Sequence, residues 1–181
     1  MSESKPAKPA AKAKPARKRA SRAKPKPAGE ATTPVRADPP KAATVEPTLF
    51  EIEFEVRWRD LDAFNHVNNS TFLTYLEEAR LRWLESLDGP WLTETSAPVL
   101  ASAELQFRRP IPWPESIRVE LQALRVGNSS LTLGHRLLSA GNASIVYCEG
   151  QAVMVWVDAA TSKGASLPDA VRRAAERCAA G

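Results

Sequence analysis

The chain has 181 residues, which is enough for one ordinary domain and an appendage. Its formal net charge is +4, but residues 1–46 hold 12 Lys and Arg against four acidic residues, so the rest of the chain carries a net charge of −4. The basic character therefore belongs to the tail. The chain has only two cysteines and no apolar signal segment at its start, which argues against a disulfide framework or a zinc cage.

Residues 1–46 form a tail rich in Lys, Ala and Pro, without Leu, Ile, Phe, Trp or Tyr. Such a segment cannot bury enough apolar surface to offset its ordering entropy, so we expect it to be disordered. It lacks the apolar region of a secretory signal. Basic tails can contact nucleic acid or anionic surfaces weakly, but a solvating arm without a specific partner is the favoured interpretation.

Residues 49–58 alternate strictly between apolar and charged side chains. The apolar positions are Phe50, Ile52, Phe54, Val56 and Trp58. This period of two predicts a strand with one face toward a core and the other toward water.

A polar segment follows the strand. In ten residues it holds two carboxylates, an imidazole and three carboxamides: Asp60, Asp62, Asn65, His66, Asn68 and Asn69. Polar groups this dense between two apolar elements form either a turn with a helix cap or a functional site.

The segment from Thr71 to Leu87 changes to a helical period. Its apolar positions are Phe72, Leu76, Ala79, Trp83 and Leu87. The pattern predicts an amphipathic helix that Asn69 or Ser70 caps and that Gly89-Pro90 ends. A single apolar stripe indicates burial against a sheet.

Four apolar or β-branched segments come next: residues 99–108, 116–126, 130–139 and 143–158. The pairs Gly127-Asn128 and Gly141-Asn142 predict tight hairpin turns between them. Residues 168–179 can form a short terminal helix. The order of elements predicts an α+β fold, an antiparallel sheet over one helix. No apolar run reaches membrane-spanning length, so we expect a soluble, cytoplasmic chain without a membrane span.

The polar segment and the helix after it resemble the motif of the 4-hydroxybenzoyl-CoA thioesterase-like, hotdog-fold acyl-CoA thioesterases, which reads Asp-x-Asp-x-x-Gly-His-Val-Asn-Asn. Asn65 stands where that family usually has Gly. The resemblance implies about five strands wrapped around one long helix. It divides the chain into a tail (1–46), a hotdog thioesterase domain (47–160) and a C-terminal extension (161–181).

The resemblance also implies the site. Asp62 would be the catalytic base or nucleophile, the backbone N–H of Asn69 the oxyanion donor, and His66 a third catalytic residue. Phe64 stands where a similar group, the plant acyl-carrier-protein thioesterases, has a catalytic Asn. The substrate-binding candidates are Phe64, Asn65, Asn68, Tyr75, Arg108 and Arg109.

Plainer roles remain open for several of these residues. Asp60 is favoured as a turn former. His66 could orient Asp62, relay a proton or merely pack. Arg108 and Arg109 could meet the phosphates of coenzyme A or simply close a strand. Arg80 is expected to pair with a carboxylate. His135 and Glu77 are expected on the surface.

The favoured function is an acyl-CoA thioesterase, acting on an acyl-CoA substrate as a homodimer or homotetramer without a metal or an organic cofactor. The alternative is a non-catalytic hotdog domain that binds acyl-CoA and is tethered by its basic tail. A hotdog dehydratase or hydratase fits the polar motif less well.

Overall fold

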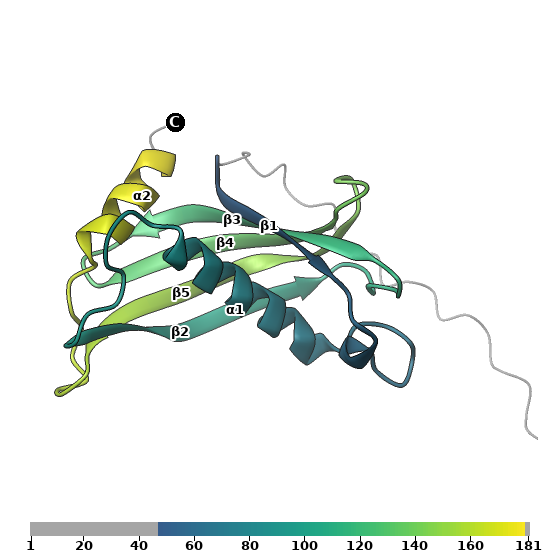
Figure 1. Ribbon diagram of the computed structural model, residues 1–181, viewed down its shortest axis with the longest axis horizontal. Helices are drawn as coiled ribbons and strands as arrows, with labels where there is room; N and C mark the ends of the chain where they lie inside the picture. Colours follow the sequence, from purple (N-terminus) through teal and green to yellow (C-terminus); the bar gives the residue numbers. More distant parts are fainter. Residues whose placement is uncertain (1–46, 180–181) are drawn as a thin grey trace, which may run out of the picture. The chain divides into compact units, whose positions relative to one another are not determined.

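The computed structural model describes residues 47–179, so the prediction for the tail lies outside the described residues. Five antiparallel strands form one sheet in the order β1-β3-β4-β5-β2, and a long helix crosses one face of it (Figure 1). The elements are β1 (Thr48–Glu55), the 3-10 turn η1 (Trp58–Asp60), α1 (Asn69–Glu85), β2 (Ser96–Phe107), β3 (Ser116–Val126), β4 (Ser130–Ser139), β5 (Val146–Asp158) and α2 (Asp169–Ala179). The predicted α+β hotdog arrangement and the short terminal helix are confirmed. Within residues 47–179, neither helix is long and apolar enough to cross a lipid bilayer.

The alternation of β1 is confirmed as far as Val56. The side chains of Phe50, Ile52 and Phe54 are half-buried and pack against the core, and Val56 is buried. The prediction that Trp58 shares this face is wrong, because the chain turns into η1 after Val56. Trp58 is 69% exposed, and its ring meets the edge of Trp113 with the ring centroids 5.4 Å apart.

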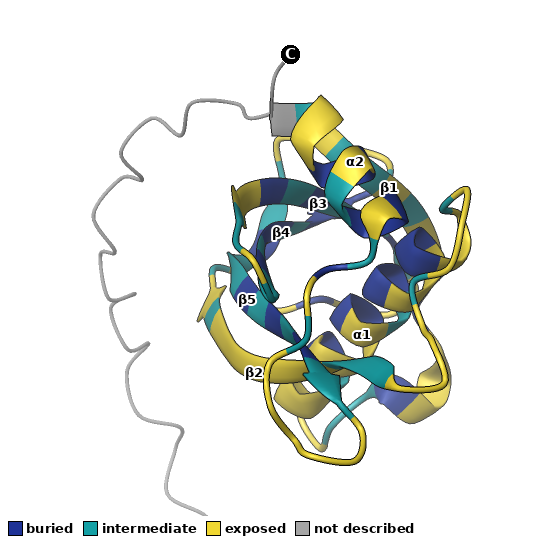
Figure 2. Cartoon of the chain, turned by 90° about the vertical axis from the view of Figure 1, so that its left-hand side faces the viewer, coloured by how far each residue is buried: buried dark blue, intermediate teal, exposed yellow. Residues whose placement is uncertain are grey.

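Helix α1 is amphipathic as predicted, and it lies against β1 and β3. Figure 2 shows its buried stripe turned toward the sheet and its exposed side turned away. The buried side chains are Phe72, Tyr75, Leu76, Ala79, Arg80, Trp83 and Leu84. Helix α2 lies beside β3 and β1.

The predicted ends of α1 are corrected at both termini. Asn68, not Asn69 or Ser70, is the N-cap: its side-chain oxygen accepts the Ser70 N–H at 2.9 Å. At the other end the helix stops at Glu85, before Gly89-Pro90. The Ser86 hydroxyl donates to the Trp83 carbonyl at 2.7 Å, a local bond that competes with continuation of the helix.

Strands β3 and β4 have the predicted bounds, but only one of the two predicted turns is short. Residues 127–129 join β3 to β4, and the Gly127 N–H donates to the Ser130 carbonyl at 2.7 Å. The β4–β5 connection, residues 140–145, is longer than a tight turn. There the Asn142 side chain accepts the Ser144 N–H at 3.0 Å and builds a wider loop.

The prediction that His135 lies on the surface is wrong. Strand β4 is central in the sheet, and His135 falls in the same alternating row as Leu131, Leu133 and Leu137, which are core residues. Its side chain is only 2% exposed.

Candidate functional site

The polar turn between η1 and α1 is closed by its own backbone. The Asp62 N–H donates to the His66 carbonyl at 2.8 Å, and the Asn65 N–H donates to the Asp62 carbonyl at 3.1 Å. Asn65 has a φ of 61°, in the left-handed region. Asn tolerates this region better than most residues, which explains how it can replace Gly at this position.

The turn fixes the Asp62 carboxylate. Its Oδ1 atom accepts the Phe64 N–H at 2.8 Å and the His66 N–H at 3.3 Å. No other hydrogen bond to this carboxylate occurs among residues 47–179. One oxygen is thus held by the backbone, while Oδ2 is left for another partner.

Asp62 lines a cavity of about 280 Å³ at the N-terminus of α1. Four other predicted site residues line the same cavity: His66, Asn69, Arg108 and Arg109. The fold therefore brings together a carboxylate, an imidazole, a helix N-terminus and two cations. These residues lie up to 47 positions apart along the chain.

The backbone N–H of Asn69 is the free donor at this helix terminus. The Ser70 N–H is taken by the Asn68 side chain, and the Thr71 N–H donates to the Asn68 carbonyl at 2.8 Å. Within the described part of the chain, the Asn69 N–H has no acceptor. The positive end of the helix dipole lies at the same place, so an oxyanion there would be stabilised.

The two arginines differ in their freedom. The Arg108 guanidinium donates to Glu149 at 2.6–2.8 Å and to Gln106 at 2.5 Å, which fixes its position. The Arg109 side chain is exposed and makes no ion pair with any residue from 47 to 179. It is the cation that can still take an anionic partner.

The other predicted substrate-binding residues do not line this cavity. Phe64 is 81% exposed, Asn65 forms the turn, and Asn68 caps the helix. Tyr75 is buried, and its hydroxyl donates to Asp60 at 2.6 Å.

Asp60 does shape the turn, as predicted, but it also reaches α1. Its carboxylate accepts the Arg57 N–H at 3.0 Å, the Arg57 guanidinium at 3.1 and 3.2 Å, and the Tyr75 hydroxyl. Burial alone would raise the pKa of Asp60, but the hydrogen bonds from Arg57 and Tyr75 outweigh it and hold that pKa below its ordinary value. Burial and the bond to Asp60 raise the pKa of Tyr75.

Two lining residues were not singled out from the sequence. Phe72 of α1 and Phe107 of β2 line the cavity and meet edge to face, with ring centroids 5.0 Å apart. Phe72 belongs to the apolar stripe of the helix, and only its position three residues after Asn69 connects it with the site. Phe107 directly precedes Arg108, which was the available clue.

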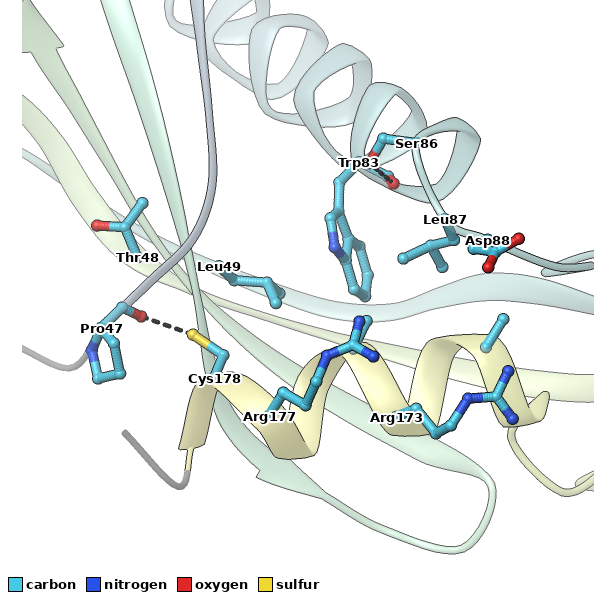
Figure 3. Close-up of a pocket in the computed structure, with 12 residues that line it drawn as sticks. Pro47, Thr48, Leu49, Trp83, Ser86, Leu87, Asp88, Arg173, Arg177 and Cys178 are labelled. Atoms are coloured by element: carbon cyan, nitrogen blue, oxygen red, sulfur yellow. Dashed lines mark hydrogen bonds between the residues drawn. The ribbon is translucent and has the colours of Figure 1, made fainter.

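A larger cavity of about 540 Å³ lies at the other end of α1 (Figure 3). It is lined by Trp83, Leu87 and Asp88 at the end of the helix, and by Arg173 and Arg177 of α2. It contains none of the predicted catalytic residues, so size alone does not identify the site. Among the described residues, no three His, Cys, Asp or Glu side chains gather as metal ligands would.

Comparison with known proteins gives the same family from sequence and from structure. The model of the thioesterase-like superfamily matches residues 56–175. The long-chain acyl-CoA thioesterase FadM of Escherichia coli is 27% identical over 129 residues, which cover 70% of this chain and 97% of FadM.

Two solved structures are similar over almost their whole length. The PA2801 protein of Pseudomonas aeruginosa is 37% identical, with a TM-score of 0.64, over 70% of this chain and 98% of PA2801. A Thermus thermophilus thioesterase in complex with coenzyme A and Zn is 31% identical, with a TM-score of 0.62, over 75% of this chain and 98% of that one. The chain therefore belongs to the thioesterase-like superfamily.

Proposed function

We propose that this chain hydrolyses acyl-CoA thioesters to a free acid and coenzyme A. The observation that carries the proposal is the pairing of the Asp62 carboxylate with the free Asn69 N–H in one cavity. Thioester hydrolysis needs a group that delivers oxygen to the carbonyl carbon and a donor for the negative charge that develops on the carbonyl oxygen. Similarity to FadM, named a long-chain acyl-CoA thioesterase, supports the substrate class.

In the proposed reaction, the free oxygen of Asp62 acts as a general base toward water or attacks the thioester carbon directly. The carbonyl oxygen becomes an oxyanion and accepts the Asn69 N–H at the positive end of α1. Collapse of the tetrahedral species breaks the C–S bond and releases the thiolate of coenzyme A. His66 lines the same cavity and, on the general-base route, would pass to that thiolate the proton that Asp62 takes from water. On the direct route the acyl group is left on Asp62 as an anhydride, and water then hydrolyses the anhydride to the free acid and restores the carboxylate.

The cations at the cavity suit the nucleotide end of the substrate. Arg109 is exposed and unpaired among residues 47–179, so its guanidinium can bind a phosphate. Arg108 would act mainly through its fixed position beside Glu149. The solved complex of the Thermus thermophilus thioesterase with coenzyme A supports this ligand class.

A homo-oligomer, a dimer or a tetramer, is part of the proposal. The cavity of about 280 Å³ lies just below the range that encloses most of a ligand, about 300–1,000 Å³. One of its walls, Phe107, is 48% exposed at the edge of the sheet. A second subunit along this edge would deepen the cavity.

The test is release of free thiol from a panel of acyl-CoAs. Asp62→Asn keeps the backbone-facing oxygen but cannot accept a proton at neutral pH, so we expect turnover to fall by about 10²- to 10⁴-fold with the fold retained. Asp60→Asn is the matched control and should retain most of the turnover per folded molecule.

Two results would contradict the proposal. Equal turnover of wild type and Asp62→Asn would remove Asp62 from the chemistry. Binding of acyl-CoA without thiol release from any member of the panel would favour the non-catalytic alternative.

A further inference from the structure

The cavity of about 540 Å³ lies between the end of α1 and helix α2, at the other end of α1 from Asp62 (Figure 3). Its volume falls within the range of about 300–1,000 Å³ that is usual for small-molecule sites. The apolar part of its lining consists of Leu49, Trp83, Leu87, Ala170 and Ala174. No residue proposed for thioester hydrolysis lines it, so its ligand is a separate question.

Helix α2 is fixed on the rest of the fold near both of its ends. Near its start, the Arg172 guanidinium donates to the carbonyls of Gly127 and Asn128 at 3.0 and 3.2 Å. Near its end, the Cys178 thiol donates to the Pro47 carbonyl at 2.9 Å, the dashed line in Figure 3. The fold therefore forms this cavity without help from a ligand, and a preformed site loses less free energy to ordering when it binds.

Two arginines of α2 line the cavity without a protein partner. Arg173 and Arg177 are four residues apart, so they lie on the same side of the helix, where like charges are mildly destabilising. Neither side chain makes an ion pair or a hydrogen bond with any residue from 47 to 179, whereas Arg172 pairs with Glu176 at 3.4 Å. Protein contacts thus do not account for this pair of cations, and their donors remain available to an anion.

Arg80 of α1 was expected to pair with a carboxylate and makes no ion pair within residues 47–179 either, but its surroundings differ. It is only 6% exposed and borders a cavity of about 100 Å³, which is too small for most organic ligands. Glu77, exposed as expected, lines the same small cavity. The arginines of α2, in contrast, are exposed beside a cavity of ligand size.

The charge of the large cavity limits the ligands that it can take. Asp88 lines the opposite wall, is exposed, and pairs with neither arginine. Figure 3 shows the Arg177 side chain directed from α2 toward Trp83 and Leu87, with Asp88 next to Leu87. The charged lining residues are thus two guanidiniums and one carboxylate, with a net charge of +1. A monoanion balances this charge.

We propose that this cavity binds a carboxylic acid that has an apolar chain or ring. The carboxylate accepts hydrogen bonds from Arg177 and Arg173, because the planar guanidinium matches its geometry. The apolar part lies against Trp83 and Leu87. The free acids that thioester hydrolysis releases belong to this class, but the inference does not depend on hydrolysis at Asp62.

Other occupants fit the lining less well. Residues 1–46 precede Pro47 in the chain, but their net charge of +8 is repelled by a cavity that is itself positive. A small inorganic anion would bind the arginines and leave the apolar lining unused. An uncharged lipid would use the apolar lining and leave both guanidiniums without an acceptor.

The first test is calorimetric titration of the full chain with decanoate at neutral pH, where one equivalent should bind per chain. Arg177→Gln should raise the dissociation constant about tenfold, and the double variant Arg173→Gln/Arg177→Gln should lose this equivalent. Arg82→Gln is the matched control, because Arg82 pairs with Glu78 and Glu85 on the exposed side of α1 and does not line the cavity. Wild type that does not bind at about 1 mM, a double variant that binds like wild type, or an equal loss in Arg82→Gln overturns the proposal.

The second test predicts a change of the opposite sign. Asp88→Asn removes the one negative charge of the lining at an exposed position, so decanoate should bind about threefold more tightly. Unchanged or weaker binding by this variant overturns the assignment of the carboxylate to this cavity.

The third test separates the charge of the ligand from its chain. Decanol lacks the charge and acetate lacks the chain, so each should bind at least about tenfold more weakly than decanoate. Equal binding of either compound, or of inorganic phosphate, overturns the ligand class. Thiol release without added acid is measured separately, so a failure of the proposed hydrolysis would leave these binding results unchanged.

Discussion

Asp60 and Asp62 stand two residues apart and have different surroundings. Asp60 is 5% exposed and receives hydrogen bonds from Arg57 and Tyr75. Asp62 borders a cavity, and within residues 47–179 its carboxylate is bound only by backbone N–H groups of its own turn. The first carboxylate ties η1 to α1. The second is held in place by the turn and keeps one oxygen free.

Asp60→Asn should lower the free energy of unfolding by about 2 kcal/mol, because charge-assisted bonds from Arg57 and Tyr75 become neutral or are lost. Urea unfolding at neutral pH measures this. Asp62→Asn, which retains an acceptor for the Phe64 N–H, is the control and should change stability much less. The opposite ranking would show that the buried carboxylate does not tie the elements together.

The stability effect of Asp60 should also depend on pH. Its folded-state pKa is lowered, so its contribution is present above the unfolded pKa, near 4, and is lost as the pH falls through the folded value. The stability difference between wild type and Asp60→Asn should therefore shrink in acid. A constant difference down to strongly acidic pH would contradict this assignment.

His135 should make stability fall between pH 6.5 and pH 4. Burial, with the nearby charge of Arg80, lowers its pKa from 6.5 to about 4, so in this window the unfolded chain binds a proton that the folded chain does not. The loss amounts to about 3 kcal/mol. Unfolding free energies measured across this range should show a slope in the wild type that is largely absent in His135→Leu. Equal slopes would mean that other groups carry the acid sensitivity.

At the scale of elements, the N-terminus of α1 contributes both to the stability of the fold and to the candidate site, because Asn68 caps the helix and Asn69 lines the cavity. Asn68 accepts the Ser70 N–H and hydroxyl, so Asn68→Ala should lower the free energy of unfolding by about 1 kcal/mol. Asn68→Asp keeps an acceptor at a position where a negative charge is favourable and should remain close to wild type. Chemical denaturation of the three chains distinguishes these cases; equal loss in both variants would assign Asn68 another role.

The bounds of the strands were predictable where the run of apolar residues alone determined them. The apolar runs of β3 and β4 gave the observed bounds, because both strands lie inside the sheet and bury one face along their length. The ends of α1 were misplaced because Asn68, Asn69 and Ser70 are all good caps, and composition does not choose between neighbours. His135 was misplaced because a lone polar residue was assigned by its type and not by its place in the alternating row.

The grouping of residues at the candidate site was predictable to the extent that it is local in sequence. Asp62, His66 and Asn69 come from one turn, and the motif that they share with a known family contains all three. Arg108 and Arg109 joined them only through the return of β2 to the N-terminus of α1. Tyr75 does not line the cavity, because its side of the helix faces η1. The helical period predicts which residues of α1 are buried, but it does not predict which of them face the cavity and which face η1.

At the scale of the whole molecule, residues 1–46 should be dispensable for folding. They carry a net charge of +8 and no large aliphatic or aromatic side chain except valine, while residues 47–179 supply every described strand and helix. A chain that begins at residue 47 should match the full chain in unfolding midpoint and in thiol release. A markedly lower midpoint, or loss of turnover, would show that the tail belongs to the domain.

Gly150 of β5 sets a limit on how this protein can be engineered. A Cβ atom there would lie 1.9 Å from the Glu104 carbonyl oxygen of β2 and 3.0 Å from His135 Nε2. The first obstacle is backbone, so no change of rotamer relieves it, and every other residue would push β2 away from β5. Because β2 leads into Phe107 and Arg108, which line the cavity beside Asp62, a substitution at Gly150 would disturb that cavity from a position that does not line it. A library that randomises β5 to change acyl preference should therefore leave this glycine unchanged.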